Sequence, residues 1–514
     1  MSQTNWIAIL DYGSQYTQLI ARRIREQQVY SEIIRFDTTA EQLRARMPAG
    51  IILSGGPNSV FEEGAPQCDP AIFELGIPVL GICYGMQLMA KMLGGVVKPG
   101  HHREYGHTRI ESTPGNRLFG GAPGEFDVWM SHGDQVESLP PGFKVSARSL
   151  SCPHAAMRND ECNFFALQFH PEVVHTQNGT TILRNFLFQI CACTADWKLT
   201  SWVETTVEKL KQQVGNDEVV LGLSGGVDSS VVAMLLHRAI GPRLHCIFVD
   251  NGLLRAGEDT QVETMFREKA GMDVHVARAA DRFYAALKGV TDPEQKRKII
   301  GREFIEVFAE EARKLKNCKF LGQGTIYPDI IESVSPTKGP SHTIKSHHNV
   351  GGLPPDLKFE LVEPLRELFK DEVRAVGRVM GMDAELLDRQ PFPGPGLGVR
   401  ILGEVNAESV RLLQQADLRV QEEMRKLPNF KSIWQSFAVL LPVKSVGVMG
   451  DQRTYENVCA LRVVDSIDAM TADWTRVPYE TLARISNRII NEVRGINRVV
   501  FDISSKPPAT IEWE

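Results

Sequence analysis

The chain has 514 residues, of which 43% are hydrophobic and 23% are charged. At about 150 residues per domain, this length predicts three or four domains and excludes a single small binding module. The formal net charge of −6 gives no overall attraction to nucleic acid or to an anionic membrane, so neither is an expected partner.

The N-terminal residues lack the charged and apolar pattern of a signal peptide, and no apolar stretch approaches the ~20 residues that span a bilayer. The nine cysteines are odd in number and scattered, with no paired CxxC of zinc-binding spacing. This pattern is typical of a reducing compartment. The sequence therefore predicts a cytoplasmic protein.

The first part of the chain alternates short apolar runs with amphipathic stretches. Strands are predicted over 6–10, 50–53 and 77–83, and residues 15–27 have helical spacing. This alternation is typical of an α/β fold with a doubly wound, mostly parallel sheet, whose ligands bind at the carboxyl ends of the strands. The expected first domain is 1–196.

The same pattern restarts after a helical stretch over 196–214. Further elements are predicted as strands over 218–223 and 244–249 and a helix over 229–240. This second doubly wound domain is expected over 197–390, because the following PFPGPG segment opposes regular structure. Residues 391–514 then predict a small α+β domain, with strands over 437–441, 446–449 and 498–503 and helices over 408–426 and 479–493.

Cys83 lies between a strand and a helix start, with a glycine two residues away on each side. This is the pattern of a nucleophile elbow, in which glycines permit a sharp turn and the helix N-terminus stabilises a thiolate. His170 and Glu172 are two residues apart on an extended segment, so they point the same way and can serve as base and orienting acceptor. The alternative is a buried structural cysteine beside ordinary polar groups.

The backbone amides of Gly56, or its neighbour Gly55, and of Tyr84 are candidates for an oxyanion hole. Residues 6 to about 195 resemble a class I glutamine amidotransferase domain. The matching segments are 11–15, 54–57, 81–87, 131–134 and 168–172. The resemblance implies that Cys83 attacks the side-chain amide of glutamine and releases ammonia, and that Gln87 and Asp134 contact the bound glutamine.

A second candidate site is a glycine- and serine-rich loop between a strand and a helix. It consists of Ser224, Gly225, Gly226, Val227, Asp228, Ser229 and Ser230. Adjacent glycines let backbone amides surround phosphate oxygens, and the helix N-terminus favours an anion. The loop lacks the lysine of a Walker motif, and the alternative is a glycine-rich turn without a ligand.

The loop instead resembles the pyrophosphate loop of the ATP pyrophosphatase family. That resemblance implies that it binds the β- and γ-phosphates of ATP and that Asp228 holds Mg²⁺, a cation that prefers carboxylate and phosphate oxygens. The end of the next strand, from Val249 to Gly252, is expected beside the ribose or adenine. No tightly bound organic cofactor is expected.

Two basic segments are candidates for contacts with substrates. Arg297 lies in a run of three cations, for which a solvated helix face is the simpler interpretation. Lys345 lies in a polar segment that ends in glycines, which is typical of a mobile lid, and it is expected to reach an ATP phosphate. The histidines of that segment have no carboxylate or cysteine to complete a metal set, so no metal is expected there. They are His342, His347 and His348.

The whole chain resembles the glutamine-hydrolysing GMP synthetase family, with motifs in family order. The remaining motif segments are 322–333, 391–398, 450–455 and 506–514. The resemblance implies adenylation of the 2-oxo oxygen of xanthosine 5′-monophosphate (XMP), release of pyrophosphate, and attack by ammonia to give GMP and AMP. It also implies that Lys506 and Glu512 contact XMP, that Arg297 contacts its phosphate, and that the last domain forms a homodimer.

Three alternatives remain at this point. The first is another glutamine-dependent ATP pyrophosphatase amidoligase, such as one that makes NAD or asparagine, although the C-terminal motifs disfavour it. The second is a binding protein with decayed sites, which the intact Cys83, His170 and Glu172 disfavour. The third is a glutaminase that feeds a separate subunit, for which a fused second site would be unnecessary.

Overall fold

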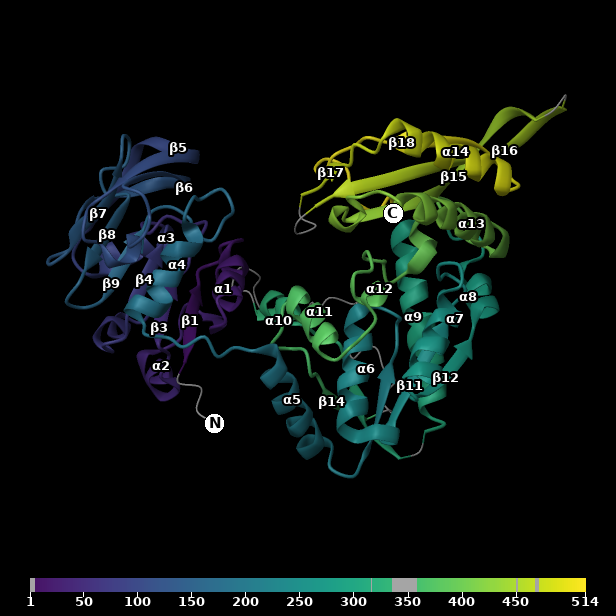
Figure 1. The fold of residues 1–514 in the computed structure, drawn as a ribbon, viewed down its shortest axis with the longest axis horizontal. Coiled ribbons are helices and arrows are strands. Elements are labelled where there is room, and N and C mark those ends of the chain that lie inside the picture. Colours follow the sequence, from purple (N-terminus) through teal and green to yellow (C-terminus); the bar gives the residue numbers. More distant parts are fainter. Residues whose placement is uncertain (1–4, 316, 335–357, 450–451, 467–470) are drawn as a thin grey trace. The chain divides into compact units, whose positions relative to one another are not determined.

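The computed structural model describes residues 5–315, 317–334, 358–449, 452–466 and 471–514 (Figure 1). The chain divides into two compact units, one of residues 1–202 with 328–342 and one of residues 203–327 with 343–514. Every helix within the described ranges is too short or too polar to cross a membrane.

The first unit contains a nine-stranded mixed sheet with the strand order β2-β1-β3-β4-β9-β8-β7-β5-β6. The strands are β1 (Trp6–Asp11), β2 (Tyr30–Arg35), β3 (Gly50–Leu53), β4 (Val79–Ile82), β5 (Val96–Ser112), β6 (Glu125–Ser138), β7 (Lys144–Ser149), β8 (Ala156–Asn159) and β9 (Phe164–Leu167). The first five strands in this order, β2, β1, β3, β4 and β9, run parallel to one another. The other four, β8, β7, β5 and β6, pair antiparallel.

The prediction of a mostly parallel sheet is therefore correct for only part of this unit. The predicted strands over 6–10, 50–53 and 77–83 are confirmed as β1, β3 and β4. The antiparallel strands β5 to β8 were not predicted. Along β6, buried and more exposed residues alternate, which is the pattern of an antiparallel sheet with one face toward water.

Helices cover both faces of the parallel strands. They are α1 (Thr17–Glu26), α2 (Ala40–Arg46), α3 (Tyr84–Met92) and α4 (Gly179–Asn185), with a π-helical turn at Phe186–Ile190. On one face, Leu53 shares a hydrophobic core with Leu43 of α2 and Met86 of α3. On the other face, Phe186 lies 3.5 Å from the position of a Cβ on Gly50. Because β3, β4 and β9 are neighbours, the residues that follow them meet at one edge.

The second unit contains a five-stranded sheet, β12-β11-β10-β13-β14, in which every pair is parallel. Its strands are β10 (Glu218–Gly222), β11 (Leu244–Asp250), β12 (Asp273–Arg278), β13 (Cys318–Gly322) and β14 (Glu360–Val362). Phe308 of α9 (Pro293–Ala312) packs 3.4 Å from the Cβ position of Gly222, and Leu236 of α6 (Val227–Ile240) packs 2.9 Å from that of Gly322. Gly222 and Gly322 lie on opposite faces of the sheet, so helices pack on both faces of this parallel sheet, as a doubly wound fold requires.

A smaller group of strands and helices follows in the same unit. The strands are β15 (Gln435–Met449), β16 (Gln452–Asp465), β17 (Asp473–Trp474) and β18 (Ile496–Asp502), and the helices are α13 (Ala407–Met424) and α14 (Tyr479–Glu492). The two predicted helices are confirmed. The strands predicted over 437–441 and 446–449 are one strand, β15, because the register shift between Leu441 and Lys444 accommodates Pro442 and the sheet continues beyond it.

The hydrophobic core of the second unit continues across residue 391. Val220 and Phe308 belong to the same core cluster as Leu440 and Ile489. The division at 391 stays a prediction. Residues 391–395 form neither helix nor strand, as predicted, and a short 3-10 helix, Gly396–Val399, begins at the last residue of the PFPGPG segment. Gly396 has a φ of +61°, and its Cβ position lies 2.3 Å from the carbonyl oxygen of Leu253, so a larger residue does not fit there.

Candidate functional site

Cys83 occupies a sharp turn between β4 and α3. Its φ of +52° lies in the left-handed region, which is rare for a residue with a side chain and is typical of strained nucleophile turns. A Cβ on Gly85 would lie 2.2 Å from the carbonyl oxygen of Leu53, and one on Gly81 would lie 2.7 Å from that of Gly85. The glycines on both sides therefore allow the close packing that this turn requires.

His170 and Glu172 follow β9, the strand next to β4 in the sheet. Nδ1 of His170 lies 2.7 Å from Oε1 of Glu172, and both side chains are buried. Burial lowers the pKa of His170, but the charge of Glu172 and the contact with the Cys83 thiol outweigh burial and raise this pKa well above 6.5. The three residues are therefore brought together, with a protonated imidazole favoured beside the sulfur.

The Cys83 sulfur has two further polar contacts. Nε2 of Gln168 lies 3.8 Å from Sγ, and the thiol donates to the carbonyl oxygen of Ser131 at 3.5 Å. The sequence interpretation gave neither residue a role. Gln168 follows β9 and Ser131 lies within β6, so only the folded sheet reveals their proximity to Cys83.

The glycines after β3 approach the same three residues. The Cβ position of Gly55 lies 3.2 Å from Cε1 of His170, and that of Gly56 lies 3.3 Å from Cγ of Tyr84. Among the described residues, the backbone amides of Gly56 and Tyr84 have no hydrogen-bond acceptor. Two free donors beside a nucleophile fit the geometry of an oxyanion hole.

Gln87 and Asp134 lie together near Cys83. The buried side chain of Gln87 donates through Nε2 to the backbone carbonyl of Asp134 at 2.8 Å. The carboxylate of Asp134 accepts from Oγ of Ser59 at 2.5 Å. Their predicted contacts with glutamine stay predictions.

A buried pair of polar side chains, from the neighbouring strands β5 and β6, supports the backbone at Asp134. Nε2 of His132 lies 2.8 Å from Oε2 of Glu104, and its Nδ1 lies 3.0 Å from the carbonyl oxygen of Asp134. Burial raises the pKa of Glu104, but hydrogen bonds from His132 and Ser151 outweigh it, so the pKa lies below 4.5. Glu104 had no predicted role, because it lies 28 residues from His132 in the sequence.

The phosphate-loop residues in the second unit fold as a compact turn between β10 and α6. Gly225 has a φ of +72°, and Gly226 is the N-cap residue of α6. Oγ of Ser229 lies 2.9 Å from Oγ of Ser224, and Oγ of Ser230 donates to the carbonyl oxygen of Gly226 at 2.7 Å. The predicted loop therefore lies at a helix N-terminus, the position that favours a phosphate.

Asp228 lies in the first turn of α6 and has one satisfied and one unsatisfied oxygen. Its Oδ2 lies 2.5 Å from Nζ of Lys370, the first residue of α11 (Lys370–Val379). Its Oδ1 is buried without a hydrogen-bond partner among the described residues. Lys370 was missed because no spacing in the sequence links α11 to the loop.

The end of β11 lies near this loop in the sheet. Val249 is buried in the hydrophobic core, so its backbone alone is available to a ligand. Oδ1 of Asp250 accepts from the amide of Gly252 at 3.0 Å. The predicted ribose or adenine contacts of this segment stay predictions.

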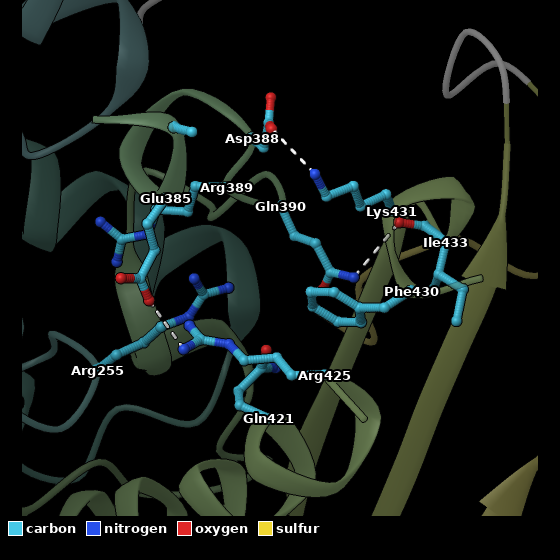
Figure 2. Close-up of a pocket in the computed structure, with 11 residues that line it drawn as sticks. Arg255, Glu385, Asp388, Arg389, Gln390, Gln421, Arg425, Phe430, Lys431 and Ile433 are labelled. Carbon is cyan, nitrogen blue, oxygen red and sulfur yellow. Dashed lines mark hydrogen bonds and ion pairs between the residues drawn. The ribbon is translucent and has the colours of Figure 1, made fainter. Parts of the chain in front are cut away.

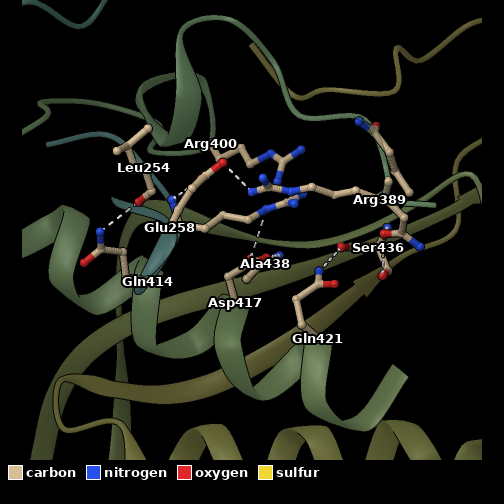
Figure 3. Close-up of polar contacts among 12 residues, drawn as sticks. Leu254, Glu258, Arg389, Arg400, Gln414, Asp417, Gln421, Ser436 and Ala438 are labelled. Carbon is tan, nitrogen blue, oxygen red and sulfur yellow. Dashed lines mark hydrogen bonds and ion pairs between the residues drawn. The ribbon is translucent and has the colours of Figure 1, made fainter. Parts of the chain in front are cut away.

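An arginine-rich cavity of about 280 Å³ is lined by Arg255, Arg389 and Arg425 (Figure 2). Arg389, which lines it, donates to the carbonyl oxygen of Gly225 at 3.3 Å and pairs with Glu258 (Figure 3). Burial, together with the nearby Arg400 and Arg389, lowers the pKa of Arg255, another lining residue, to about 10, although its acidic neighbours act in the opposite direction. Crowded, buried cations favour an anionic ligand. Arg389 had no predicted role.

The C-terminal tail is held by three cations, of which Arg400 and Lys296 are buried. Arg400 binds the carboxylate of Glu512 with two hydrogen bonds of 2.8 and 3.0 Å. Arg297 donates to the main-chain oxygen of Glu514 at 2.5 Å, and Nζ of Lys296 pairs with its side chain. These contacts attach Glu512 and Glu514 to the rest of the second unit.

The other basic residues that the sequence analysis singled out differ in their surroundings where the structure describes them. Lys506 forms a backbone bridge with Ala472. Arg297, predicted to contact a nucleotide phosphate, contacts the chain terminus in this structure. Lys345 and the histidines at 342, 347 and 348 lie outside the described residues.

Three known protein families match successive parts of this chain. They are described as glutamine amidotransferase class-I over residues 8–190, NAD synthase over 198–304 and GMP synthase C terminal domain over 422–513. The NAD synthase match covers the phosphate loop.

Similar proteins match along the full chain. A glutamine-hydrolyzing GMP synthase of Maridesulfovibrio salexigens is 58% identical over 516 residues, covering 100% of both chains. Proteins with the same description from Brachyspira hyodysenteriae and Solidesulfovibrio magneticus are 57% identical, covering 99% of both chains, and 58% identical, covering 100% of both. With more than half of its residues identical to these proteins from end to end, the chain belongs to the glutamine-hydrolysing GMP synthase family.

Proposed function

We propose that the two sites divide the synthesis of GMP from XMP, glutamine and ATP. The site around Cys83 releases ammonia from glutamine. The site around the phosphate loop adenylates XMP, and ammonia then displaces AMP. The observation that carries this proposal is the presence of two sites in one chain. The first has a complete set of thiol, imidazole and carboxylate. The second is a phosphate loop with a buried carboxylate oxygen that has no hydrogen-bond partner among the described residues.

In the first site, Cys83 is the nucleophile. His170 takes the proton of the Cys83 thiol, the sulfur attacks the amide carbon of the glutamine side chain, and the amides of Gly56 and Tyr84 donate to the oxygen that becomes negative. His170 gives a proton to the leaving nitrogen, which departs as ammonia and leaves a thioester. Water, activated by His170, then attacks the thioester carbon and releases glutamate, while Glu172 keeps the imidazole oriented.

In the second site, the backbone of residues 224–230 holds the β- and γ-phosphates of ATP. The 2-oxo oxygen of XMP attacks the α-phosphorus, pyrophosphate leaves, and ammonia replaces the adenylated oxygen with release of AMP. Asp228 fits a Mg²⁺ ligand, because Oδ1 is an unpaired, buried carboxylate oxygen. Bound Mg²⁺ would neutralise phosphate charge. Lys370 and Arg389 supply further positive charge beside the loop.

The proposed XMP contacts lie around the C-terminal tail. Arg297 contacts the tail, Glu512 lies within it and is held by Arg400, and Lys506 is at its start. We propose that XMP replaces the contact between Arg297 and the main chain of Glu514, so that the guanidinium binds the nucleotide phosphate. Lys345 is proposed to reach an ATP phosphate.

The proposed setting is a homodimer, formed through residues 391–514, in the cytoplasm. All nine cysteines are free, which fits a reducing compartment. The expected partners are the small-molecule substrates, with no nucleic acid and no membrane. Sedimentation equilibrium of the full chain, compared with a mass of 57.3 kDa for one copy, tests the dimer.

Chromatographic product analysis tests the proposed reaction. Purified protein is mixed with Mg²⁺, ATP, glutamine and XMP, and each component is omitted in turn. GMP, AMP, pyrophosphate and glutamate are expected together, and omission of XMP is expected to prevent GMP formation. Cleavage of ATP to AMP only with a different acceptor would support another amidoligase of the same class.

Replacement of Glu172 by glutamine is expected to lower the pKa of His170. The charge that raises this pKa is lost, whereas burial, which lowers it, remains. At neutral pH the imidazole would then be mostly neutral and less well oriented, and we expect a loss of glutamine hydrolysis on the order of a thousandfold. NMR titration of labelled histidine checks the pKa. An unchanged titration of His170 in Glu172→Gln would contradict the ion pair.

Replacement of Glu104 by glutamine is expected to impair glutamine use about ten- to a hundredfold, because His132 loses its anionic partner and the part of β6 at Asp134 moves. Synthesis from added ammonia is expected to stay at the wild-type rate. Steady-state kinetics with both nitrogen sources measures this difference. Glu111→Gln, an exposed change in the same strand, is the matched control. Equal losses with both nitrogen sources would indicate a general folding defect instead.

A further inference from the structure

The register of the second sheet places five polar side chains at the amino ends of four neighbouring strands. Glu218 pairs with Cys318, and His245 pairs with Asp273. His245 also pairs with a residue two positions after Glu218, and His275 lies two positions after Asp273. Because paired residues in a regular parallel ladder, and residues two apart in one strand, point to the same face, Glu218, His245, Asp273 and His275 share one face. Cys318 pairs with Glu218 where the register of β10 and β13 shifts, and its sulfur lies beside the same group. The phosphate loop follows the opposite end of β10.

His245 is the centre of this cluster. Its Nδ1 lies 2.7 Å from Oδ2 of Asp273, and that same oxygen lies 3.0 Å from Nε2 of His275. Its Nε2 lies 3.3 Å from Oε2 of Glu218, but it is a buried atom without a hydrogen bond among the described residues. One ring nitrogen is therefore fixed by a carboxylate, and the other is left available.

Cys318 completes a set of donor atoms around the available nitrogen. One ligand atom each of Glu218, His245 and Cys318 lies within 4.8 Å of the others. Cys318 also packs against the hydrophobic core of the unit, and His245 is 18% exposed, so the group is partly shielded from water. Thiolate, imidazole and carboxylate are the three donor types that Zn²⁺ takes in proteins.

We propose that Glu218, His245 and Cys318 bind one Zn²⁺ at the amino edge of the second sheet. Nε2 of His245, the sulfur of Cys318 and a carboxylate oxygen of Glu218 supply three ligands, and water takes the fourth position of a tetrahedral site. The Cys318 thiol releases its proton to solvent on binding, and the two anionic ligands balance the charge of the metal. Asp273 accepts the hydrogen on Nδ1, which is the usual partner of a zinc-bound imidazole.

The competing explanation is a metal-free ion network, in which a protonated His245 bridges Glu218 and Asp273. That network gives Cys318 no role, and it places a donor hydrogen on Nε2 without a well-oriented acceptor. A bound metal accounts for both features. The two explanations differ in whether the sulfur takes part, so variants of Cys318 separate them.

The test is metal binding by the full-length protein after removal of metals with a chelator, in the absence of nucleotide. Zn²⁺ is titrated against a coloured competing chelator, and Co²⁺ is added separately to observe thiolate-to-metal absorption. We expect one Zn²⁺ per chain and a sulfur-to-cobalt band. Asp273→Asn should weaken zinc binding about ten- to a hundredfold. His245→Gln and Cys318→Ser should weaken it more, and Cys318→Ser should abolish the band.

Two controls make the result specific. Cys162→Ser removes an exposed thiol elsewhere and should leave zinc binding unchanged. His132→Gln tests a separate group of potential ligands, Glu104, His132 and Cys152, which shares no residue with the proposed site, and should also leave zinc binding unchanged. Ammonia-dependent GMP synthesis reports whether each variant is folded. No stoichiometric zinc binding by the wild type, or zinc binding that survives both His245→Gln and Cys318→Ser in folded protein, would overturn the proposal.

Discussion

Replacement of Cys83 by alanine is expected to abolish glutamine-dependent GMP synthesis, with a loss of at least about ten-thousandfold, while synthesis from added ammonia continues at the wild-type rate. The sulfur at the turn after β4 is the nucleophile that His170 and Glu172 serve, and alanine leaves no atom to form the thioester. Initial rates of GMP formation with each nitrogen source measure both activities in one preparation.

The matched control for this variant is Cys162→Ala, which removes an exposed thiol from the same unit. It is expected to keep both activities. If Cys83→Ala lost ammonia-dependent synthesis as well, the two sites would not be separate, and the division of the reaction between them would be wrong.

Replacement of Asp228 by asparagine is expected to stop pyrophosphate release with either nitrogen source, with a loss of about a thousandfold or more. The variant lacks the charged oxygen that is buried and unpaired in the phosphate loop, and it leaves Lys370 without its carboxylate partner. Pyrophosphate release from ATP in the presence of XMP is the measurement. Glutamine hydrolysis at Cys83 is a different step and is measured separately.

Asp259→Asn is a suitable control, because the carboxylate of Asp259 contacts Thr260 in the same unit rather than the phosphate loop. It is expected to release pyrophosphate at the wild-type rate. A wild-type rate in Asp228→Asn would remove Asp228 from the proposed Mg²⁺ site and from phosphate binding.

The sequence predicted those parts of the fold that depend on local patterns. Continuous apolar runs followed by glycine turns identified β1, β3, β4 and β10, because both faces of a parallel strand are buried. The antiparallel strands β5 to β8 have a weaker alternating pattern and were not predicted. The single strand β15 was divided in two, since Pro442 interrupts its apolar run.

The candidate sites show the same limit. Cys83, His170 and the loop at Asp228 follow strands with recognisable turn patterns, so their positions were predictable. Lys370 reaches Asp228 from 142 residues away, and no local pattern records that contact. The zinc ligands proposed at His245 are similar, because the register between strands brings them together.

The most direct test of the reaction uses XMP that carries ¹⁸O at the 2-oxo position. The protein is given this XMP with Mg²⁺, ATP and glutamine, and the products are separated and analysed by mass spectrometry. If the 2-oxo oxygen attacks the α-phosphorus, the ¹⁸O appears in AMP, and pyrophosphate remains unlabelled. Release of ADP and phosphate, or GMP formation with unlabelled AMP, would contradict adenylation of XMP at the phosphate loop.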